Sequence, residues 1–255
     1  GYKKMTSRFP QSLTGFDCKQ CASPLDFDFS FAFQPIVDLR QGRIWGYEAL
    51  VRGRHGESAT SVLSRVNDNN RYAFDQLCRV KAITLAAALG LRQILSINFL
   101  PNAVYEPAHC IRSTLEAARQ VRFPADRIMF EVAESERVPQ PEHLTRIFEY
   151  YRSQGFITAL DDFGSGHSGL TLLSCFLPTI IKIDMALIRD IPSNRAKQVI
   201  VTALLDICQQ LDIKVLAEGI ETAEELAWLE DRGVRLIQGY YFARPGFECL
   251  PHVSL

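Results

Sequence analysis

The sequence predicts a closed α/β barrel, a TIM-like (β/α)8 barrel whose first strand runs antiparallel to the second. Three observations predict it: short β-like runs alternate with helical stretches, eight such runs fall within residues 29–255, and the first two are joined by a short turn. A parallel crossover needs about a dozen residues or more, so this turn can only join antiparallel strands. A doubly wound open sheet is the alternative architecture.

The elements follow in order along the chain. Phe31–Asp38 and Ile44–Val51 form the expected antiparallel pair. The other strands are expected at Ile94–Phe99, Ile128–Val132, Phe156–Leu160, Thr179–Ile183, Ile213–Ala217 and Val234–Ile237. Helices are expected at Ser61–Asn67, Tyr72–Leu89, Ile111–Arg119, Glu142–Ser153, Ser168–Phe176, Arg195–Gln210 and Ala223–Asp231. Thr222 and Glu225 make a capping-box pattern at the start of the last helix. This alternation indicates a mainly parallel sheet covered on both faces.

Composition limits the class of protein. The chain has 255 residues, 47% of them hydrophobic, and a formal net charge of -1. These values are typical of a folded protein, and they argue against DNA binding and a polybasic membrane anchor. No apolar run approaches 18 residues, so no membrane span is expected. Residues 1–28 lack periodicity and are interpreted as an N-terminal extension or linker ahead of one domain, 29–255.

The cysteines suggest no disulfide framework. Seven are scattered along the chain, and most lie in apolar segments, where reduced buried thiols are expected. Cys18 and Cys21 form a C-x-x-C, but no second pair completes a zinc site. No secretory signal follows the first charged residues. A cytoplasmic location is therefore expected.

Polar residues interrupt the expected strands near their ends. They are Glu48, Asn98, Glu131, Asp161, Asp162, Lys182, Asp184, Glu218 and Gln238. In a parallel barrel these ends meet at one mouth, where active sites of this fold lie. Asn98 or Gln238 alone is better explained as a satisfied buried polar group than as a functional residue. The whole set predicts a functional site.

The acids in this set require cations. Five carboxylates in one mouth repel one another, and Lys182 supplies a single positive charge. Oxygen ligands with one amide suit Mg²⁺ or Mn²⁺. The adjacent Asp161 and Asp162 suggest two ions, since one aspartate can bridge metals about 3.5–4 Å apart, a spacing used for displacement at phosphorus. The motifs of P-loop, Rossmann and α/β-hydrolase sites are absent.

An ordered set of motifs resembles a known family. Glu48-Ala49-Leu50, followed by Val51-Arg52, is similar to the signature of the EAL domain family. The matching segments run from Phe33-Gln34-Pro35-Ile36 through Asn98, Glu131-Val132-Ala133-Glu134, Asp161-Asp162-Phe163-Gly164-Ser165-Gly166, Ile181-Lys182-Ile183-Asp184 and Ala217-Glu218-Gly219-Ile220-Glu221-Thr222 to Gln238-Gly239-Tyr240-Tyr241-Phe242-Ala243-Arg244-Pro245. The resemblance implies a barrel with an antiparallel first strand and hydrolysis of cyclic di-GMP to linear pGpG with two divalent ions.

The resemblance also implies roles for individual residues. Metal ligands would be Glu48, Asn98, Glu131, Asp161, Asp162 and, through the water shell, Glu218. Catalytic residues would be Glu48, Asp161, Asp162, Lys182 and Glu218. Substrate contacts would come from Gln34, Leu50, Arg52, Asp184, Glu221 and Gln238. Glu134 would brace the loop after Asp162. Arg52 is explained equally well by pairing with a nearby acid.

The chain departs from the family pattern after Asp162. The family loop usually reads D-D-F-G-T-G-Y-S-S, whereas Ser165, His167 and Gly169 stand at three of its positions here. No implied ligand is lost, so an active phosphodiesterase is expected. The alternatives are a catalytically silent cyclic di-GMP receptor and a protein-interaction module. A homodimer and an upstream sensory domain are further expectations from the family.

Overall fold

The computed structural model describes residues 25–254 apart from 135, 137–140 and 167–168. Its strands are β1 (Phe29–Asp38), β2 (Arg43–Gly53), β3 (Ile94–Asn98), β4 (Ile128–Ala133), β5 (Ile157–Phe163), β6 (Ile180–Ile183), β7 (Lys214–Ala217), β8 (Leu236–Ile237) and β9 (Gly246–Phe247). Its helices are α1 (Ala59–Leu63), α2 (Arg71–Ala88), α3 (Pro107–Cys110), α4 (Arg112–Gln120), α5 (Pro141–Ser153), α6 (Gly169–Cys175), α7 (Met185–Ile188), α8 (Arg195–Gln210) and α9 (Ala223–Glu230). Cys18, Cys21 and His167 lie outside the described residues.

Strands β1 to β8 close into a barrel. Strands β2 to β8 pair in chain order and parallel, and β1 pairs antiparallel with β2 on one side and β8 on the other. Phe33 lies opposite Ala49, and Val37 lies opposite Ile237. The antiparallel first strand is confirmed, and closure rules out the open-sheet alternative.

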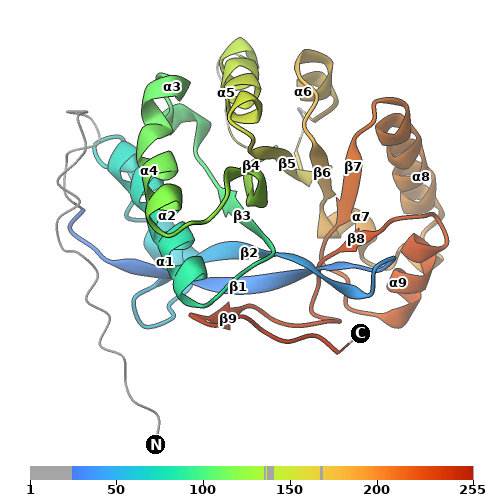
Figure 1. Ribbon diagram of the computed structural model, residues 1–255. Coiled ribbons are helices and arrows are strands. Elements are labelled where there is room, and N and C mark those ends of the chain that lie inside the picture. The colour runs from blue at the N-terminus through green and yellow to red at the C-terminus, as the bar shows by residue number, and fades with distance from the viewer. Residues whose placement is uncertain (1–24, 135, 137–140, 167–168, 255) are drawn as a thin grey trace, which may run out of the picture.

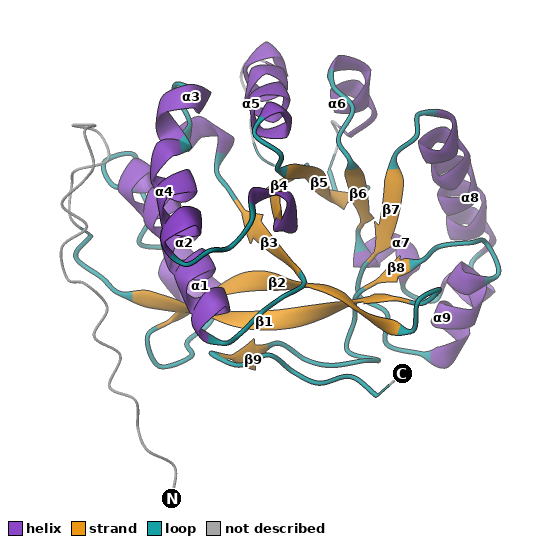
Figure 2. Cartoon of the chain, viewed as in Figure 1, coloured by secondary structure: helices purple, strands orange, loops and turns teal. Residues whose placement is uncertain are grey.

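Helices surround the strands except along β1 (Figure 2). Because β1 leads into β2 through a turn, no helix follows it. The C-terminal segment lies there instead, beside β1 in Figure 1. Ala32 of β1 pairs with Phe247 of β9, and the Tyr47 hydroxyl donates to the Pro251 carbonyl at 3.0 Å. This segment covers the face that a helix would cover elsewhere in the barrel.

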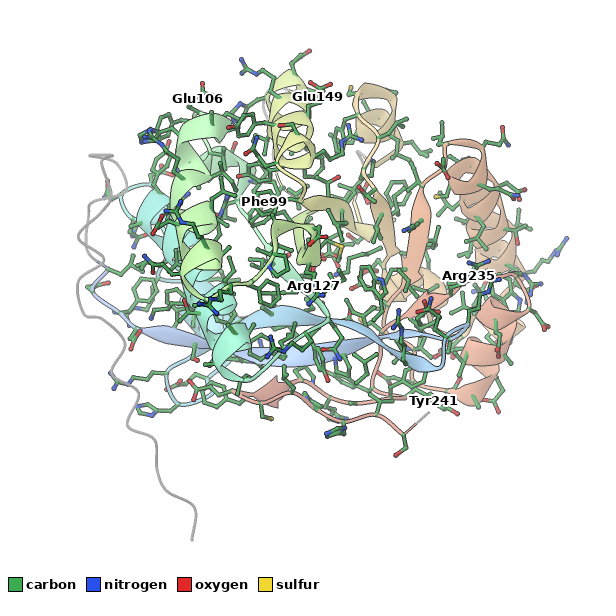
Figure 3. All side chains as sticks on the ribbon, in the orientation of Figure 1. Phe99, Glu106, Arg127, Glu149, Arg235 and Tyr241 are labelled. Carbon is green, nitrogen blue, oxygen red and sulfur yellow. The ribbon has the colours of Figure 1, made fainter. Side chains whose placement is uncertain are left out.

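The barrel has apolar residues on both faces of its wall. Outward-facing residues pack beneath the helices, as Phe99 does where it follows β3 (labelled in Figure 3). Its ring meets those of Phe130 and Phe148 edge-on, with centroids 6.0 Å apart in each case. A smaller buried cluster of inward-facing residues comes from six strands: Ile36, Met129, Ala159, Ile180, Leu216 and Leu236. The wall is therefore buried on both sides, as a parallel barrel requires.

Several expectations about element boundaries need correction. The helix expected at Ser61–Asn67 is the shorter α1, which ends at Leu63, and β5 continues through Asp161 and Asp162 to Phe163. Helices α3 and α7 and strand β9 were not expected. The capping box is confirmed, because the Thr222 hydroxyl accepts from the Glu225 amide and the Glu225 carboxylate accepts from the Thr222 amide. No helix in the described part of the chain is long and apolar enough to cross a membrane.

Candidate active site

The polar residues occupy a layer directly above the apolar barrel interior. Side chains two residues apart on a strand share a face. Two residues beyond Met129, Ala159, Ile180, Leu216 and Leu236 stand Glu131, Asp161, Lys182, Glu218 and Gln238. Strand β1 runs the other way, so Gln34 precedes Ile36 by two. The same pleat therefore forms an apolar layer below and a polar layer at the carboxyl ends of the parallel strands.

A cleft of about 520 Å³ opens above this layer. Eleven of the residues implied by the family resemblance line it: Gln34, Glu48, Leu50, Arg52, Asn98, Asp161, Asp162, Asp184, Glu218, Glu221 and Gln238. Glu131 and Lys182 are fully buried and do not line the cleft. Glu134 also lies outside its lining. The structure thus brings the whole set together, and three buried members lie outside the lining of the cleft.

Lys182 lies at the centre of the acids. Its Nζ is 2.8 Å from Glu218 Oε1, 2.9 Å from Asp161 Oδ1, 3.1 Å from Glu131 Oε2 and 3.4 Å from Glu48 Oε2. Burial alone would lower the lysine pKa, but the four carboxylates together raise it well above its ordinary value. The four carboxylates therefore favour the charged ammonium, which neutralises part of the cluster.

One ammonium does not balance four carboxylates. Burial, with the Glu48 and Asp161 charges, raises the pKa of Glu131 well above its usual range although Lys182 opposes the shift. Burial and Asp161 likewise raise the pKa of Glu218. Burial, Asp161 and Asp184 raise the pKa of Asp162 to about 6. The protein keeps these acids together at a cost in stability, so a further cation would relieve the repulsion.

A bulge in β5 turns two consecutive acids to the same side. Side chains of successive strand residues normally point to opposite faces. Between Leu160 and Phe163 the register with β6 shifts, and Asp162 has a positive φ of 53°. This left-handed backbone is uncommon for a residue with a side chain, and it places both aspartates in one cluster. The adjacent pair suggested by the sequence is thus made possible by an irregular strand.

The acids form two groups with oxygen atoms close enough to hold a cation. Glu48, Glu131 and Asp161 form one group, and Asp161, Asp162 and Glu218 form the other; in each, the ligand atoms lie within 4.8 Å of one another. Asp161 belongs to both. Carboxylate oxygens are the donors preferred by Mg²⁺ and Mn²⁺, so the residues fit divalent ions.

Asn98 presents its amide nitrogen to the first group. Its Nδ2 donates to Glu48 Oε1 at 3.1 Å and to Glu131 Oε1 at 3.2 Å. Gln238 Nε2 also donates to Glu48 Oε2, at 2.7 Å, and to Gln34 Oε1. Amide donors thus offset part of the carboxylate charge. A half-turn of the Asn98 amide would present its oxygen to a cation instead.

Glu134 contacts the segment after Asp162 from beneath. Its carboxylate accepts backbone N–H groups from Gly164 at 2.7 Å, Gly166 at 3.2 Å and Gly169 at 2.5 Å. A Cβ at Gly169 would lie 2.7 Å from the Phe163 ring and 2.9 Å from Glu134 Oε1. The glycine that departs from the family pattern therefore allows a close approach here.

Arg52 is not paired with an acid. It is half-buried, and its Nη1 donates to the Val51 carbonyl at 2.7 Å. No carboxylate lies within 4.0 Å of it among the described residues. The ion-pair interpretation is therefore wrong in this structure, and the guanidinium can bind an anion in the cleft.

The sequence did not identify several residues that shape the cleft. Leu63, Met185 and Tyr240 line it and are 46–47% exposed, giving it an apolar rim. Tyr240 belongs to a quoted motif but had no assigned role. Arg189 lies behind the rim and contacts Glu221, and nothing in the local sequence indicates this contact.

The fold and the site define the class of protein. It is an α/β barrel whose cleft, at the carboxyl ends of the strands, contains a cluster of acids that could hold cations. The chain belongs to the EAL domain family, whose model matches residues 25–245.

Two curated relatives from Escherichia coli are similar to most of the chain. The blue light- and temperature-regulated antirepressor BluF is 31% identical over 92% of this chain and 58% of its own length. The probable cyclic di-GMP phosphodiesterase PdeN is 30% identical over 85% of this chain and 43% of its own. The chain thus spans about half the length of these relatives.

Two solved structures share the fold. A standalone versatile EAL protein from Vibrio cholerae, in its c-di-GMP-bound form, has a TM-score of 0.88 and 60% identity over 91% of this chain and 98% of its own. Klebsiella pneumoniae BlrP1, as a manganese and cyclic di-GMP complex, has a TM-score of 0.81 and 36% identity over 86% of this chain and 56% of its own.

Proposed function

We infer that this protein is a divalent-metal-dependent phosphodiesterase that hydrolyses cyclic di-GMP to linear pGpG. One observation carries the proposal: four acids of the two carboxylate groups that share Asp161 line the same cleft as Arg52, whose guanidinium has no acid partner among the described residues. This combination suits a phosphodiester held between cations and an arginine fork. The cyclic di-GMP named for the Vibrio cholerae and BlrP1 structures, and the activity named for PdeN, support the choice of substrate.

The proposed cofactor is a pair of Mg²⁺ or Mn²⁺ ions. Glu48, Asn98, Glu131 and Asp161 would hold one ion; Asp161 and Asp162, with Glu218 close by, would hold the other. When bound, such ions supply Lewis-acid polarisation of a phosphate and an acidified water. The manganese named for the BlrP1 complex is consistent with this assignment.

The chain's own residues bind the substrate and handle the proton. Arg52 would clamp a phosphate by two parallel N–H bonds. Glu218 lines the cleft beside Asp161 and Lys182, so it would accept a proton from the attacking water. Lys182 would hold Glu218 and Asp161 in place and offset the charge that develops above them.

The bond changes follow from the product. Water adds to one phosphorus of the ring and the 3′ oxygen leaves as a hydroxyl. The new terminal phosphate therefore stays on the 5′ side, as in pGpG. Opening one of the two phosphodiesters consumes one water and needs no oxidant or reductant.

The test is a nucleotide assay. The purified chain is incubated with cyclic di-GMP and Mg²⁺ or Mn²⁺, or with EDTA, and the products are separated by chromatography. Conversion to pGpG only with metal is expected. Glu48→Gln should lower the rate by about 100-fold or more, whereas Glu149→Gln, on the exposed surface of α5, should leave it unchanged. Undiminished cyclic di-GMP at high protein concentration would reject the proposal.

The second candidate function is that of a catalytically silent cyclic di-GMP receptor. The similarity to BluF, named an antirepressor, and the altered residues Ser165, His167 and Gly169 favour it. Binding of cyclic di-GMP without turnover in the same assay would support this candidate. Absence of binding would leave the protein-interaction module, which the complete set of acids and Arg52 argues against.

The arrangement of the longer molecule stays a prediction. We propose that residues 29–255 form the phosphodiesterase domain, that residues 1–28 tether it to a sensory domain, and that it acts as a homodimer in the cytoplasm. Light scattering with and without cyclic di-GMP would test the homodimer. A monomer at all concentrations would contradict it.

A further inference from the structure

The loop after β7 is bound to the end of α7 by one arginine. Arg189 Nη2 lies 2.8 Å from Glu221 Oε1 and donates to the Gly219 carbonyl at 3.3 Å. Its Nη1 lies 3.7 Å from Glu225 Oε1. The arginine therefore joins α7, which begins directly after Asp184, to the loop that carries Glu218 and Glu221.

The backbone of this loop is fixed without Arg189. The buried Glu225 carboxylate accepts N–H groups from Asp190 at 3.1 Å, Glu221 at 2.9 Å and Thr222 at 3.2 Å. Gly219, at φ 70°, lies so close to Met185 that a Cβ there would meet Met185 Cβ at 2.3 Å. Arg189 adds one longer backbone contact, at the Gly219 carbonyl, and it orients the Glu221 side chain.

Glu221 reaches the cleft with one oxygen held. It lines the cleft and its side chain is 43% exposed. Oε1 is bound by Arg189, and Oε2 has no partner among the described residues. A carboxylate accepts hydrogen bonds only. A fixed Oε2 therefore suits a base edge that donates, and it repels an edge with a lone pair at the same place.

Guanine and adenine differ in this respect. The guanine edge carries N–H donors at N1 and at the 2-amino group, whereas adenine has an acceptor at N1 and no 2-amino group. A carboxylate that is free to rotate would discriminate less, because it can turn away from adenine or towards solvent. A fixed orientation of its carboxylate would therefore allow Glu221 to discriminate guanine from adenine.

We propose that Arg189 is a positioning residue that sets guanine specificity by holding the Glu221 carboxylate against the base edge. This inference rests on the proposed function and adds a residue to its substrate selection. The pair is partly exposed, so its contribution to folding is small. Its effect appears in ligand discrimination instead.

The experiment measures binding of cyclic di-GMP and cyclic di-AMP by calorimetry in EDTA, where no turnover occurs. Variants are Arg189→Ala, Arg189→Lys, Glu221→Ala and the Arg189→Ala/Glu221→Ala pair. The exposed Arg195→Ala, at the start of α8, is the matched control. Glu221→Ala should lower the guanine preference by about 10- to 100-fold, the usual effect of a charged hydrogen bond. Arg189→Ala should lower it by about tenfold, and Arg189→Lys should restore part of it.

The double variant separates positioning from general damage. If Arg189 acts through Glu221, removing it in the Glu221→Ala background changes the preference no further. If Arg189 had a merely structural role, its removal would weaken binding of both nucleotides equally. The ratio of the two affinities would then stay unchanged, and this result would overturn the inference. An undiminished guanine preference in Arg189→Ala would overturn it while leaving the proposed function intact. If the wild type binds neither nucleotide in EDTA, the inference fails, whereas the proposed function is judged separately by the nucleotide assay with metal.

Discussion

Two buried cations in this protein have opposite surroundings. Arg79 of α2 is fully buried and pairs with one acid, Asp75, at 2.8 Å; it also donates to the Tyr151 hydroxyl at 2.6 Å. Lys182 is equally buried but is surrounded by four carboxylates. The first centre balances its charge and the second has an excess of acid. Arg79 and Lys182 are thus equally buried, but Arg79 belongs to a structural ion pair, whereas Lys182 belongs to a site that has room for a further positive charge.

The Arg79 centre also supports the site from behind. Asp75 Oδ1 accepts the Leu100 backbone N–H at 2.8 Å, two residues after Asn98. The guanidinium lies over the rings of Phe99 and Phe130. A balanced pair thus fixes the end of β3, from which Asn98 faces the unbalanced acids. The difference teaches that charge excess, rather than burial of charge, distinguishes the functional centre.

The largest expected effect comes from removing either cation. Arg79→Met and Lys182→Met should each destabilise the metal-free protein by about 3–5 kcal/mol, because buried carboxylates lose their partner. Excess Mg²⁺ or Mn²⁺ should restore much of the loss in Lys182→Met and none in Arg79→Met. Urea unfolding with EDTA or with metal measures both. Equal metal rescue of the two variants would remove the distinction between the centres.

A smaller effect, of opposite sign at the two centres, is expected from neutralising an acid. Glu131→Gln should raise the metal-free stability by about 1 kcal/mol, because burial and the Glu48 and Asp161 charges oppose ionisation of Glu131 in the folded state and raise its pKa. It should also weaken stabilisation by metal. Burial also raises the pKa of Asp75, although Arg79 opposes the shift. Asp75→Asn should nevertheless lower stability, because it leaves the buried Arg79 without its only acid partner in the described structure, and it should leave metal stabilisation unchanged. Thermal melts with and without metal measure whether each variant is more or less stable than the wild type. Stability changes of the same sign in both variants would contradict the prediction.

The smallest expected effect is a metal-sensitive pH dependence. Asp162, with a folded pKa of about 6, binds more protons folded than unfolded between its ordinary value near 4 and pH 6. The contribution of Asp162 to metal-free stability should therefore fall as pH rises through this window and level off above it. Bound metal keeps Asp162 ionised and should flatten this part of the curve. A pH dependence that is identical with and without metal would place the titrating acid outside the metal site.

Much of the fold and the acidic set could be predicted because both depend on local patterns. The short turn after Asp38 required an antiparallel pair, and the period-two pleat that sends Met129 inward also sends Glu131 inward. The β5 bulge could not be predicted, because the positive φ of Asp162 depends on pairing with β6. The C-terminal β9 was missed because its two residues form a strand only beside β1.

The sequence by itself determined which strand residues face alternate sides of the sheet and which strand ends carry acids. It also determined that the second strand must run antiparallel to the first. These follow from backbone geometry over a few residues. Only the tertiary structure decided that Lys182 contacts four carboxylates, that Arg52 has no acid beside it in the described part of the chain, and that Arg189 reaches Glu221. Such contacts join residues distant in the chain, so their distances depend on how the strands register and how the helices seat against the barrel.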